Sequence, residues 1–189
     1  MSLRTEVDSA GKIVRNGGTI VYPTDTIWGI GCDATNKEAV EKISTLKLRP
    51  NNKSYIILLD SIDKVRRYVK SVPEVAYELF ETAESPLTLI LDGGLNLAPN
   101  VLGEDGSIGI RIIHEGFAHE LIKRLNKPLV STSANTSGVE APKYFEEIEQ
   151  SILDGVDYAV NLPDTNLVSP KASSIIKIRH NSEITILRK

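Results

Sequence analysis

The sequence lacks the features that define several protein classes. With one cysteine among 189 residues it cannot form an internal disulfide, and its three scattered histidines make no metal-ligand cluster. We therefore expect no metal site built by the protein itself. The longest apolar run, residues 55–59, is far shorter than the ~20 residues of a membrane-spanning helix. The N-terminus has neither the basic start nor the apolar stretch of a signal peptide. These absences favour a reducing cytoplasm and no membrane.

An excess of charge of one sign is also missing. The chain has 22 basic and 25 acidic residues, which gives a net charge of −3, whereas affinity for a phosphate backbone depends mainly on lysine and arginine. Hydrophobic residues make up 41% and charged residues 25%, which is typical of a soluble globular protein. The length suits one domain over residues 1–189.

The spacing of apolar residues switches repeatedly between the helical and the strand period. Helices are predicted at residues 7–14, 39–46, 62–69, 73–80, 117–125 and 144–152. Strands are predicted at residues 19–22, 54–59, 87–91, 107–113, 129–132, 158–160, 174–178 and 184–187, and residues 28–32 also look extended. This alternation predicts an α/β layered fold with a mixed sheet.

One motif suggests a different function. Residues 29–34 match the dinucleotide fingerprint G-x-G-x-x-A. That fingerprint requires glycines that join a strand directly to a helix N-terminus, whereas this segment looks extended itself. We therefore expect no dinucleotide site, and the Walker A pattern of P-loop NTPases is absent from the sequence.

Two polar segments, each at the end of a predicted helix or strand, contain side chains that could bind a ligand. The first, residues 22–26, ends a strand in Thr24, Asp25 and Thr26. The second, residues 47–54, places Lys47, Arg49 and Lys53 after a helix. Its alternative interpretation is a solvated helix end whose cations complement the helix dipole.

Two further segments carry hydroxyl groups beside a guanidinium or an amide. Ser107 and Arg111 are four residues apart on one expected strand, so both face the same side. Ser131 and Ser133 share a face before a turn that contains Asn135, although hydroxyl-rich turn chemistry is the alternative here. Together the four segments predict a cavity with cations for phosphates and hydroxyls for a small polar substrate.

The ordered set of motifs resembles one known family. It comprises Val21-Tyr-Pro-Thr-Asp-Thr-Ile-Trp-Gly-Ile-Gly-Cys-Asp33, Lys47-Leu-Arg49-Pro, Pro86-Leu-Thr-Leu, Gly109-Ile-Arg111 and Ser131-Thr-Ser-Ala-Asn135. The sequence is similar to the YrdC/Sua5 family of threonylcarbamoyl-AMP synthases in its short, single-domain form. The resemblance runs from about residue 17 to residue 188. It implies a twisted α/β sheet of parallel and antiparallel strands, with flanking helices and a concave central cavity.

The resemblance also implies an activity. The family condenses L-threonine, bicarbonate or CO2 and ATP into threonylcarbamoyl-adenylate and pyrophosphate, with Mg2+ accompanying ATP, and a separate transferase complex then modifies tRNA. It implies threonine contacts at Thr26, Arg111, Ser131 and Ser173. It implies contacts to ATP at Lys47, Arg49, Lys53, Ser107, Ser133, Asn135 and Arg188. Lys47 and Arg49 are also expected to serve catalysis, together with Asp25. That carboxylate either orients or deprotonates the amine, or only orders its loop.

Departures from the family pattern leave two alternatives open. Residues 83–86 read Ala-Glu-Ser-Pro where relatives usually have Trp-Pro-Gly-Pro, and Leu58 replaces a frequent histidine. The late Ser-Thr pair appears as Ser173-Ser174. A paralogue with a different substrate is therefore one alternative. The other is a module that binds double-stranded RNA or tRNA, although the net negative charge does not favour it.

Overall fold

The computed structural model describes residues 2–49, 54–162 and 172–189. Its strands are β1 (Ile20–Pro23), β2 (Trp28–Gly31), β3 (Ile56–Leu59), β4 (Leu87–Leu91), β5 (Ile108–Ile112), β6 (Leu129–Ser133), β7 (Tyr158–Ala159), β8 (Ser174–Ile178) and β9 (Ile184–Arg188). Its α-helices are α1 (Leu3–Arg15), α2 (Lys37–Leu46), α3 (Glu74–Thr82), α4 (Gly116–Leu125) and α5 (Gln150–Gly155). Three short 3-10 helices are η1 (Ile62–Arg67), η2 (Pro99–Val101) and η3 (Phe145–Glu147).

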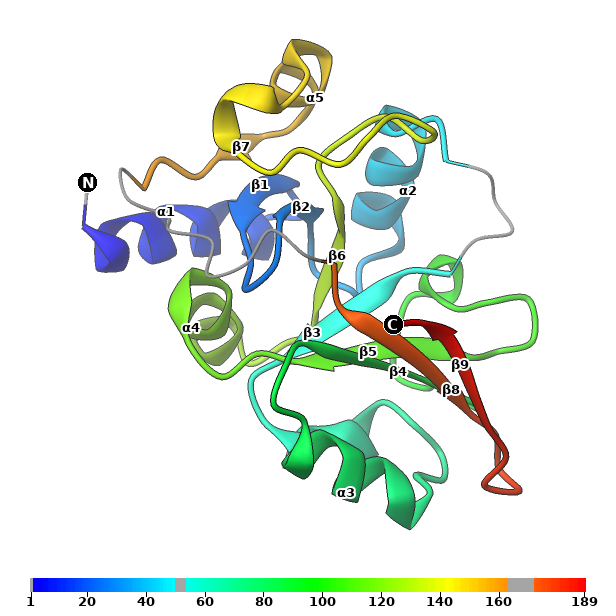
Figure 1. Ribbon diagram of the computed structural model, residues 1–189. Coiled ribbons are helices and arrows are strands. Elements are labelled where there is room, and N and C mark those ends of the chain that lie inside the picture. Colours follow the sequence, from blue (N-terminus) through cyan, green and yellow to red (C-terminus); the bar gives the residue numbers. More distant parts are fainter. Residues whose placement is uncertain (1, 50–53, 163–171) are drawn as a thin grey trace.

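The described strands form one nine-stranded sheet in the order β7-β1-β2-β6-β3-β5-β4-β8-β9 (Figure 1). The pairs β1/β7, β3/β5 and β4/β8 are parallel. The pairs β1/β2, β2/β6, β3/β6, β4/β5 and β8/β9 are antiparallel. The predicted mixed sheet with flanking helices is therefore confirmed.

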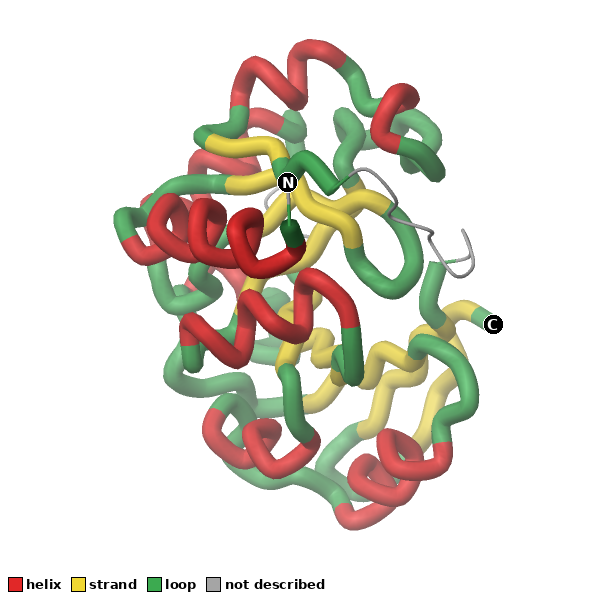
Figure 2. Tube along the Cα trace, turned by 90° about the vertical axis from the view of Figure 1, so that its left-hand side faces the viewer, coloured by secondary structure: helices red, strands yellow, loops and turns green. Residues whose placement is uncertain are grey.

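Helices cover both faces of the sheet, and each face has its own apolar core. On one face α1 and α4 lie side by side (Figures 1 and 2) and pack with Tyr22, Leu58 and Leu129. On the other face α2 and α3 cover residues such as Ile57 and Ile110. Side chains alternate along each strand, so a strand contributes to both cores in turn.

Two predicted helices differ from the observed elements. Residues 62–67 are helical, as predicted, but they form a 3-10 helix, capped by the Ser61 hydroxyl, that ends at Arg67. Residues 144–152 are not one helix, because η3 and α5 are separated at Ile148 and Glu149. Ile148 is buried in the core, and the Glu149 carboxylate accepts a hydrogen bond from the Thr136 backbone 2.8 Å away. These tertiary contacts favour a break over a continuous helix.

The glycines of the G-x-G-x-x-A segment lie inside strand β2, as its extended appearance predicted. A side chain at Gly31 would meet the Val130 carbonyl oxygen at 2.3 Å and the Tyr22 ring at 2.7 Å. Gly31 therefore permits close packing of β1, β2 and β6 rather than an approach to phosphates.

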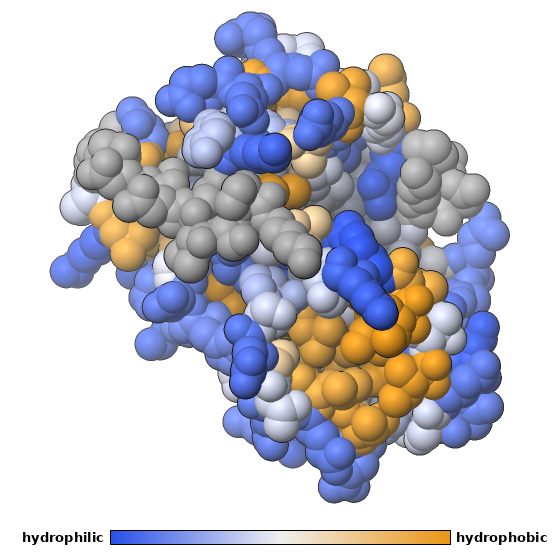
Figure 3. Space-filling model, viewed as in Figure 1, coloured by the Kyte–Doolittle hydropathy of each residue, from blue (hydrophilic) through white to orange (hydrophobic). Residues whose placement is uncertain are grey.

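The C-terminal strands carry exposed apolar side chains. Ile184, Ile186 and Leu187 of β9 are about half exposed, and Figure 3 shows apolar surface gathered over the region of β8 and β9.

Within the described residues no helix is both long and apolar enough to cross a bilayer.

Candidate active site

Strand register gathers the polar candidates on one face of the sheet, the face that also carries α1 and α4. Directly paired residues of neighbouring strands point to the same side. Arg111 pairs with Leu58 of β3 and with Thr88 of β4, and Thr88 pairs in turn with Ile175 of β8. Ile175 pairs with Arg188. Arg111 and Arg188 therefore share a face, although 77 positions separate them in the sequence.

Ser131 and Ser133 belong to this same face. Ser131 pairs with Ile56, which pairs on its other side with Gly109, two residues before Arg111. Ser133 pairs with Gly29. The prediction that the two serines share a face is confirmed, and the register places them on the side of Arg111.

The loop between β1 and β2 brings Asp25 and Thr26 onto Arg111. The Thr24 hydroxyl accepts hydrogen bonds from the Thr26 and Ile27 backbone amides at 3.1 and 3.2 Å and donates to the Ile27 carbonyl at 2.7 Å. This local turn fixes the loop. Arg111 Nη1 then donates to Thr26 Oγ1 at 3.2 Å, and Nη2 lies 3.1 Å from Asp25 Oδ1.

The environment of this cluster is dry and charged. Thr26 is 1% exposed and Arg111 is 5% exposed. Burial raises the pKa of the Asp25 carboxyl, and the Arg111 guanidinium opposes that rise. Among the described residues Arg111 Nε has no hydrogen-bond partner. A buried donor of this kind is one that a bound anion would satisfy.

A second cluster links β4, β8 and β9. The Ser173 hydroxyl lies 2.8 Å from the Thr88 hydroxyl, and Ser173 is 3% exposed. Arg188 Nε donates to the Ser173 carbonyl at 2.8 Å, and its Nη2 lies 3.4 Å from Ser173 Oγ. Burial and the nearby Arg111 lower the pKa of Arg188. Both arginines thus contribute positive potential to one region.

The end of α2 orients the cationic segment. The Leu48 amide donates to the Thr45 carbonyl and the Arg49 amide donates to Ser44, and Leu48 has a left-handed φ of 50°. This is a Schellman motif, which ends the helix and redirects the chain. The backbone of these residues therefore does end a helix, as the alternative interpretation predicted. Their side chains make further contacts.

Lys47 is almost fully buried, unlike a solvated helix-end lysine. Its Nζ donates to the Ser133 carbonyl at 2.5 Å and also to the Asn135 carbonyl. Burial, together with the nearby Arg49, lowers the pKa of Lys47 to about 8. Asn135 is buried as well, and within the described part of the chain its Oδ1 has no partner. Lys47 therefore joins α2 to the turn after β6.

Arg49 lies against Tyr55 and the start of β3. Its guanidinium carbon is 4.5 Å from the centre of the Tyr55 ring, and Nη2 donates to the Ser54 carbonyl at 2.7 Å. Lys53, the third predicted cation, falls outside the described residues.

Ser107 is buried just before β5, at the opposite end of that strand from Arg111. Its amide donates to Asp105 Oδ1 at 3.1 Å, and Asp105 pairs with Lys177 at 2.7 Å. The structure thus joins Ser107 to the β8 side of the sheet rather than directly to Lys47 or Arg49.

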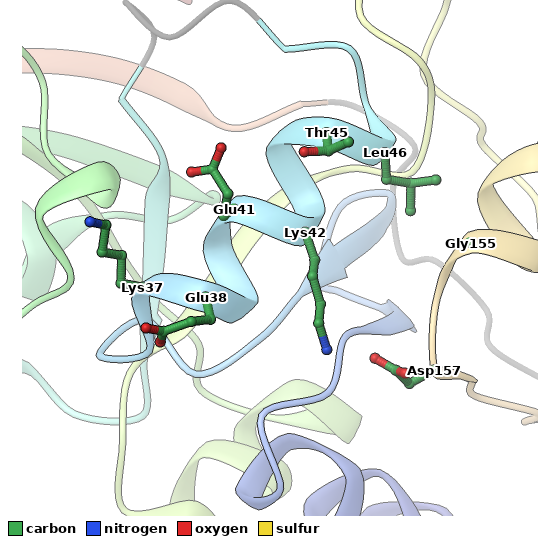
Figure 4. Close-up of a pocket in the computed structure, with 8 residues that line it drawn as sticks. All are labelled: Lys37, Glu38, Glu41, Lys42, Thr45, Leu46, Gly155 and Asp157. Carbon is green, nitrogen blue, oxygen red and sulfur yellow. The ribbon is translucent and has the colours of Figure 1, made fainter.

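A separate groove lies away from these clusters (Figure 4). It has a volume of about 1040 Å³ and is lined by one side of α2, by the last residue of α5 and by Asp157. Lys42 and Asp157 extend toward it from opposite sides. None of its lining residues is a predicted site residue. The Asp157 carboxylate already accepts hydrogen bonds from the backbone amide and the hydroxyl of Thr19. We place the candidate site on the sheet face, because that is where convergent charged and hydroxyl groups occur.

Comparison with known proteins establishes the family. A family model described as Telomere recombination, which covers Sua5, YciO and YrdC proteins, matches residues 12–189. The chain belongs to the Sua5/YciO/YrdC family. Curated relatives of this Sua5/YciO/YrdC chain are named threonylcarbamoyl-AMP synthase. One from Pseudomonas aeruginosa strain UCBPP-PA14 is 34% identical over 149 residues, which cover 78% of this chain and 80% of the relative. One from Psychromonas ingrahamii is 28% identical over 172 residues, which cover 88% of this chain and 90% of the relative.

Solved structures of the Sua5/YciO/YrdC family share the fold. P. abyssi Sua5 complexed with L-threonine has a TM-score of 0.84 at 24% identity over 94% of this chain. This chain spans about half of that protein, 52% of its length. E. coli YciO has a TM-score of 0.81 at 25% identity and covers 100% of this chain and 90% of YciO.

One residue of the site was not predicted from the sequence. Thr88 is completely buried, lies in register with Arg111 and bonds to Ser173. The Pro86-Leu-Thr-Leu motif contained it, yet a threonine within a strand gives no functional signal by itself, since threonine is common in sheets.

Proposed function

We propose that this chain is an L-threonylcarbamoyladenylate synthase, a nucleotidyltransferase that uses L-threonine, bicarbonate or CO2, and ATP. The observation that carries the proposal is the contact of Arg111 with both Asp25 and Thr26. The names of the curated relatives support the same activity.

The cluster matches an α-amino acid group by group. A guanidinium binds a carboxylate through two parallel hydrogen bonds, and Arg111 supplies it. Asp25, 3.1 Å from that guanidinium, is the anion for the substrate ammonium, which in an α-amino acid lies next to the carboxylate. The hydroxyl and methyl of Thr26 would contact those of threonine. Ser131 and Ser173 complete the proposed amino-acid subsite.

The proposed nucleotide subsite lies around the end of α2 and the turn after β6. Lys47 and Arg49 supply positive charge for the triphosphate, with Lys53 as a third proposed contact. Ser133 and Asn135 supply hydrogen-bonding groups, and Asn135 Oδ1, which has no partner within the described segments, supports this role. Ser107 and Arg188 are the remaining proposed contacts.

Mg2+ is proposed to accompany ATP. Mg2+ prefers charged oxygen ligands, and among the named site residues only Asp25 has a carboxylate. That carboxylate already forms an ion pair with Arg111. The named site residues therefore fit an Mg2+ ion whose ligands come mainly from the triphosphate and water. When bound, such an ion would neutralise phosphate charge.

The chemistry requires little beyond positioning and charge stabilisation. The threonine ammonium gives one proton to solvent by way of Asp25. The lone pair of the resulting amine bonds to the carbon of CO2, one C=O π bond shifts its electrons onto oxygen, and a second N–H proton passes to solvent, which yields a carbamate. A carbamate oxygen then bonds to the α-phosphorus while the bond to pyrophosphate breaks. Lys47 and Arg49 would stabilise the charge on the leaving pyrophosphate. We propose a tRNA-modifying transferase as the consumer of the adenylate.

A turnover assay tests this function. The chain is incubated with ATP, Mg2+, bicarbonate and L-threonine in the absence of RNA, and pyrophosphate and the adenylate are measured, the latter by mass. We expect pyrophosphate release that depends on both threonine and bicarbonate. Release with another amino acid but not threonine would indicate a paralogue with a different substrate. RNA binding without turnover would indicate a binding module.

Arg49→Ala serves as the matched variant in the same assay. If Arg49 makes charge-assisted hydrogen bonds to phosphate, its removal costs roughly 1.5–3 kcal/mol, or about 10- to 150-fold in kcat/KM for ATP. A folded variant with wild-type kcat/KM for ATP would assign Arg49 a structural role at the end of α2 instead of a contact with phosphate.

A further inference from the structure

Thr88 has an unusual place for a completely buried hydroxyl. It lies on the site face, directly paired with Arg111 on one side and with Ile175 on the other. Its hydroxyl lies 2.8 Å from the Ser173 hydroxyl, within hydrogen-bond distance. Ile90 lies two residues further along β4 on the same face and is apolar. An apolar residue can therefore occupy this face of β4, so burial alone does not explain why residue 88 is a threonine.

Ser173 is held from two sides. Thr88 contacts its hydroxyl, and Arg188 contacts both its carbonyl, at 2.8 Å, and its hydroxyl, at 3.4 Å. A serine hydroxyl has one proton to donate and two lone pairs that accept. If Thr88 and Arg188 both donate, the lone pairs are used and the Ser173 proton is left for a third group.

We propose that Thr88 is a positioning residue for the amino-acid substrate: by donating to Ser173 Oγ it directs the Ser173 proton toward a substrate oxygen. This inference rests on the proposed function, because it needs Ser173 to contact threonine. Thr88 is completely buried and contacts Ser173, so its proposed effect passes through Ser173.

The first test compares Thr88→Val with Thr88→Ser. Valine keeps the shape and removes the hydroxyl, and serine keeps the hydroxyl. We expect Thr88→Val to raise KM for threonine by about threefold to tenfold, the usual effect of one neutral hydrogen bond. KM for ATP should stay within about twofold, and Thr88→Ser should keep KM for threonine within about twofold. Calorimetric binding of L-threonine gives the same comparison without turnover.

The second test asks whether the effect passes through Ser173. In a Ser173→Ala background, Thr88→Val should add nothing to KM for threonine, because the group that Thr88 positions is gone. Thr19→Val is the matched control. Thr19 is also buried and its hydroxyl donates to Asp157 at 3.1 Å, so this variant should lose stability and keep both KM values.

The outcomes separate the two proposals. Wild-type KM for threonine in Thr88→Val, equal increases in both KM values, or an undiminished effect in Ser173→Ala would overturn the role of Thr88 while the enzyme remains active. A wild-type chain that neither binds nor turns over threonine would overturn both. If Thr88→Val does not fold, Thr88→Ala takes its place against Thr88→Ser.

Discussion

Arg111 shows how much one side chain can organise. Nη1 contacts Thr26 and Nη2 contacts Asp25, each nitrogen has a second N–H group, and among the described residues Nε has no acceptor. The planar guanidinium can hold these groups and a carboxylate in fixed directions, which an ammonium cannot do.

Arg111→Lys should therefore weaken threonine binding and spare ATP. We expect a loss of at least about tenfold in threonine affinity, since hydrogen bonds to charged groups contribute roughly 1.5–3 kcal/mol each. Calorimetry with L-threonine, and separately with ATP, measures both. Equal threonine affinity in the folded variant would contradict the assignment.

Lys47 makes the protein sensitive to pH. Its pKa in the folded state is about 8, below the ordinary value of 10.5, so between these values the unfolded chain binds the proton more tightly. The free energy of unfolding therefore gains a contribution as pH rises from about 8 to 10.5, up to about 3 kcal/mol.

Lys47→Met isolates this contribution because it keeps the length and removes the titrating group. Urea unfolding of both chains at pH 7.5 and pH 10 should show the wild type gaining stability relative to the variant. Over the same range kcat/KM for ATP should fall, since a neutral amine no longer attracts phosphate. A constant stability difference would mean that Lys47 titrates normally.

At the scale of the element, α2 ends at a strained residue. Leu48 has a φ of 50° and is 75% exposed. The left-handed conformation costs an L-residue roughly 1–2 kcal/mol, and glycine occupies it freely.

Leu48→Gly should stabilise the fold. Relief of strain exceeds the roughly 0.4–1 kcal/mol that glycine adds to the entropy of the unfolded chain, so we expect a gain of about 0.5–1 kcal/mol. Denaturant unfolding measures it. Turnover should not change, and lost turnover at normal stability would show that the Leu48 side chain takes part in the site.

At the scale of the whole molecule, the site joins strands from distant parts of the chain. The loop before β2, the middle of β5, the end of β6 and the β8–β9 pair all contribute to it. A ligand that bridges these elements binds the folded state only, and therefore stabilises it.

L-Threonine at about 100 times its Kd should stabilise the chain by roughly 2.7 kcal/mol and raise Tm by about 5–10 °C. Differential scanning fluorimetry measures this shift. At the same concentration L-serine, which lacks the methyl group, should give a smaller shift, and so should threonine with Arg111→Lys. An identical shift with serine would show that the methyl group is not recognised.

Most of the local structure could be predicted from the amino-acid sequence. Most helices and strands follow from their apolar spacing, because periodicity depends on neighbours along the chain. The extended conformation of β2 and the shared face of Ser131 and Ser133 were also predicted correctly, because both depend only on residues that are close in the sequence. Its polar segments and the family resemblance identified Arg111, Thr26 and Asp25 as candidates before any contact was visible.

The contacts between these elements depend on the packing of the whole chain and could not be predicted from local sequence. The contact of Thr88 with Ser173 spans 85 positions, and it depends on β4 pairing with β8 in one particular register. The burial of Lys47 by the turn after β6, and the break between η3 and α5, likewise come from distant residues. Strand order, register and side-chain burial are properties of the whole packed chain, since the free energy of each pairing depends on what every other element covers.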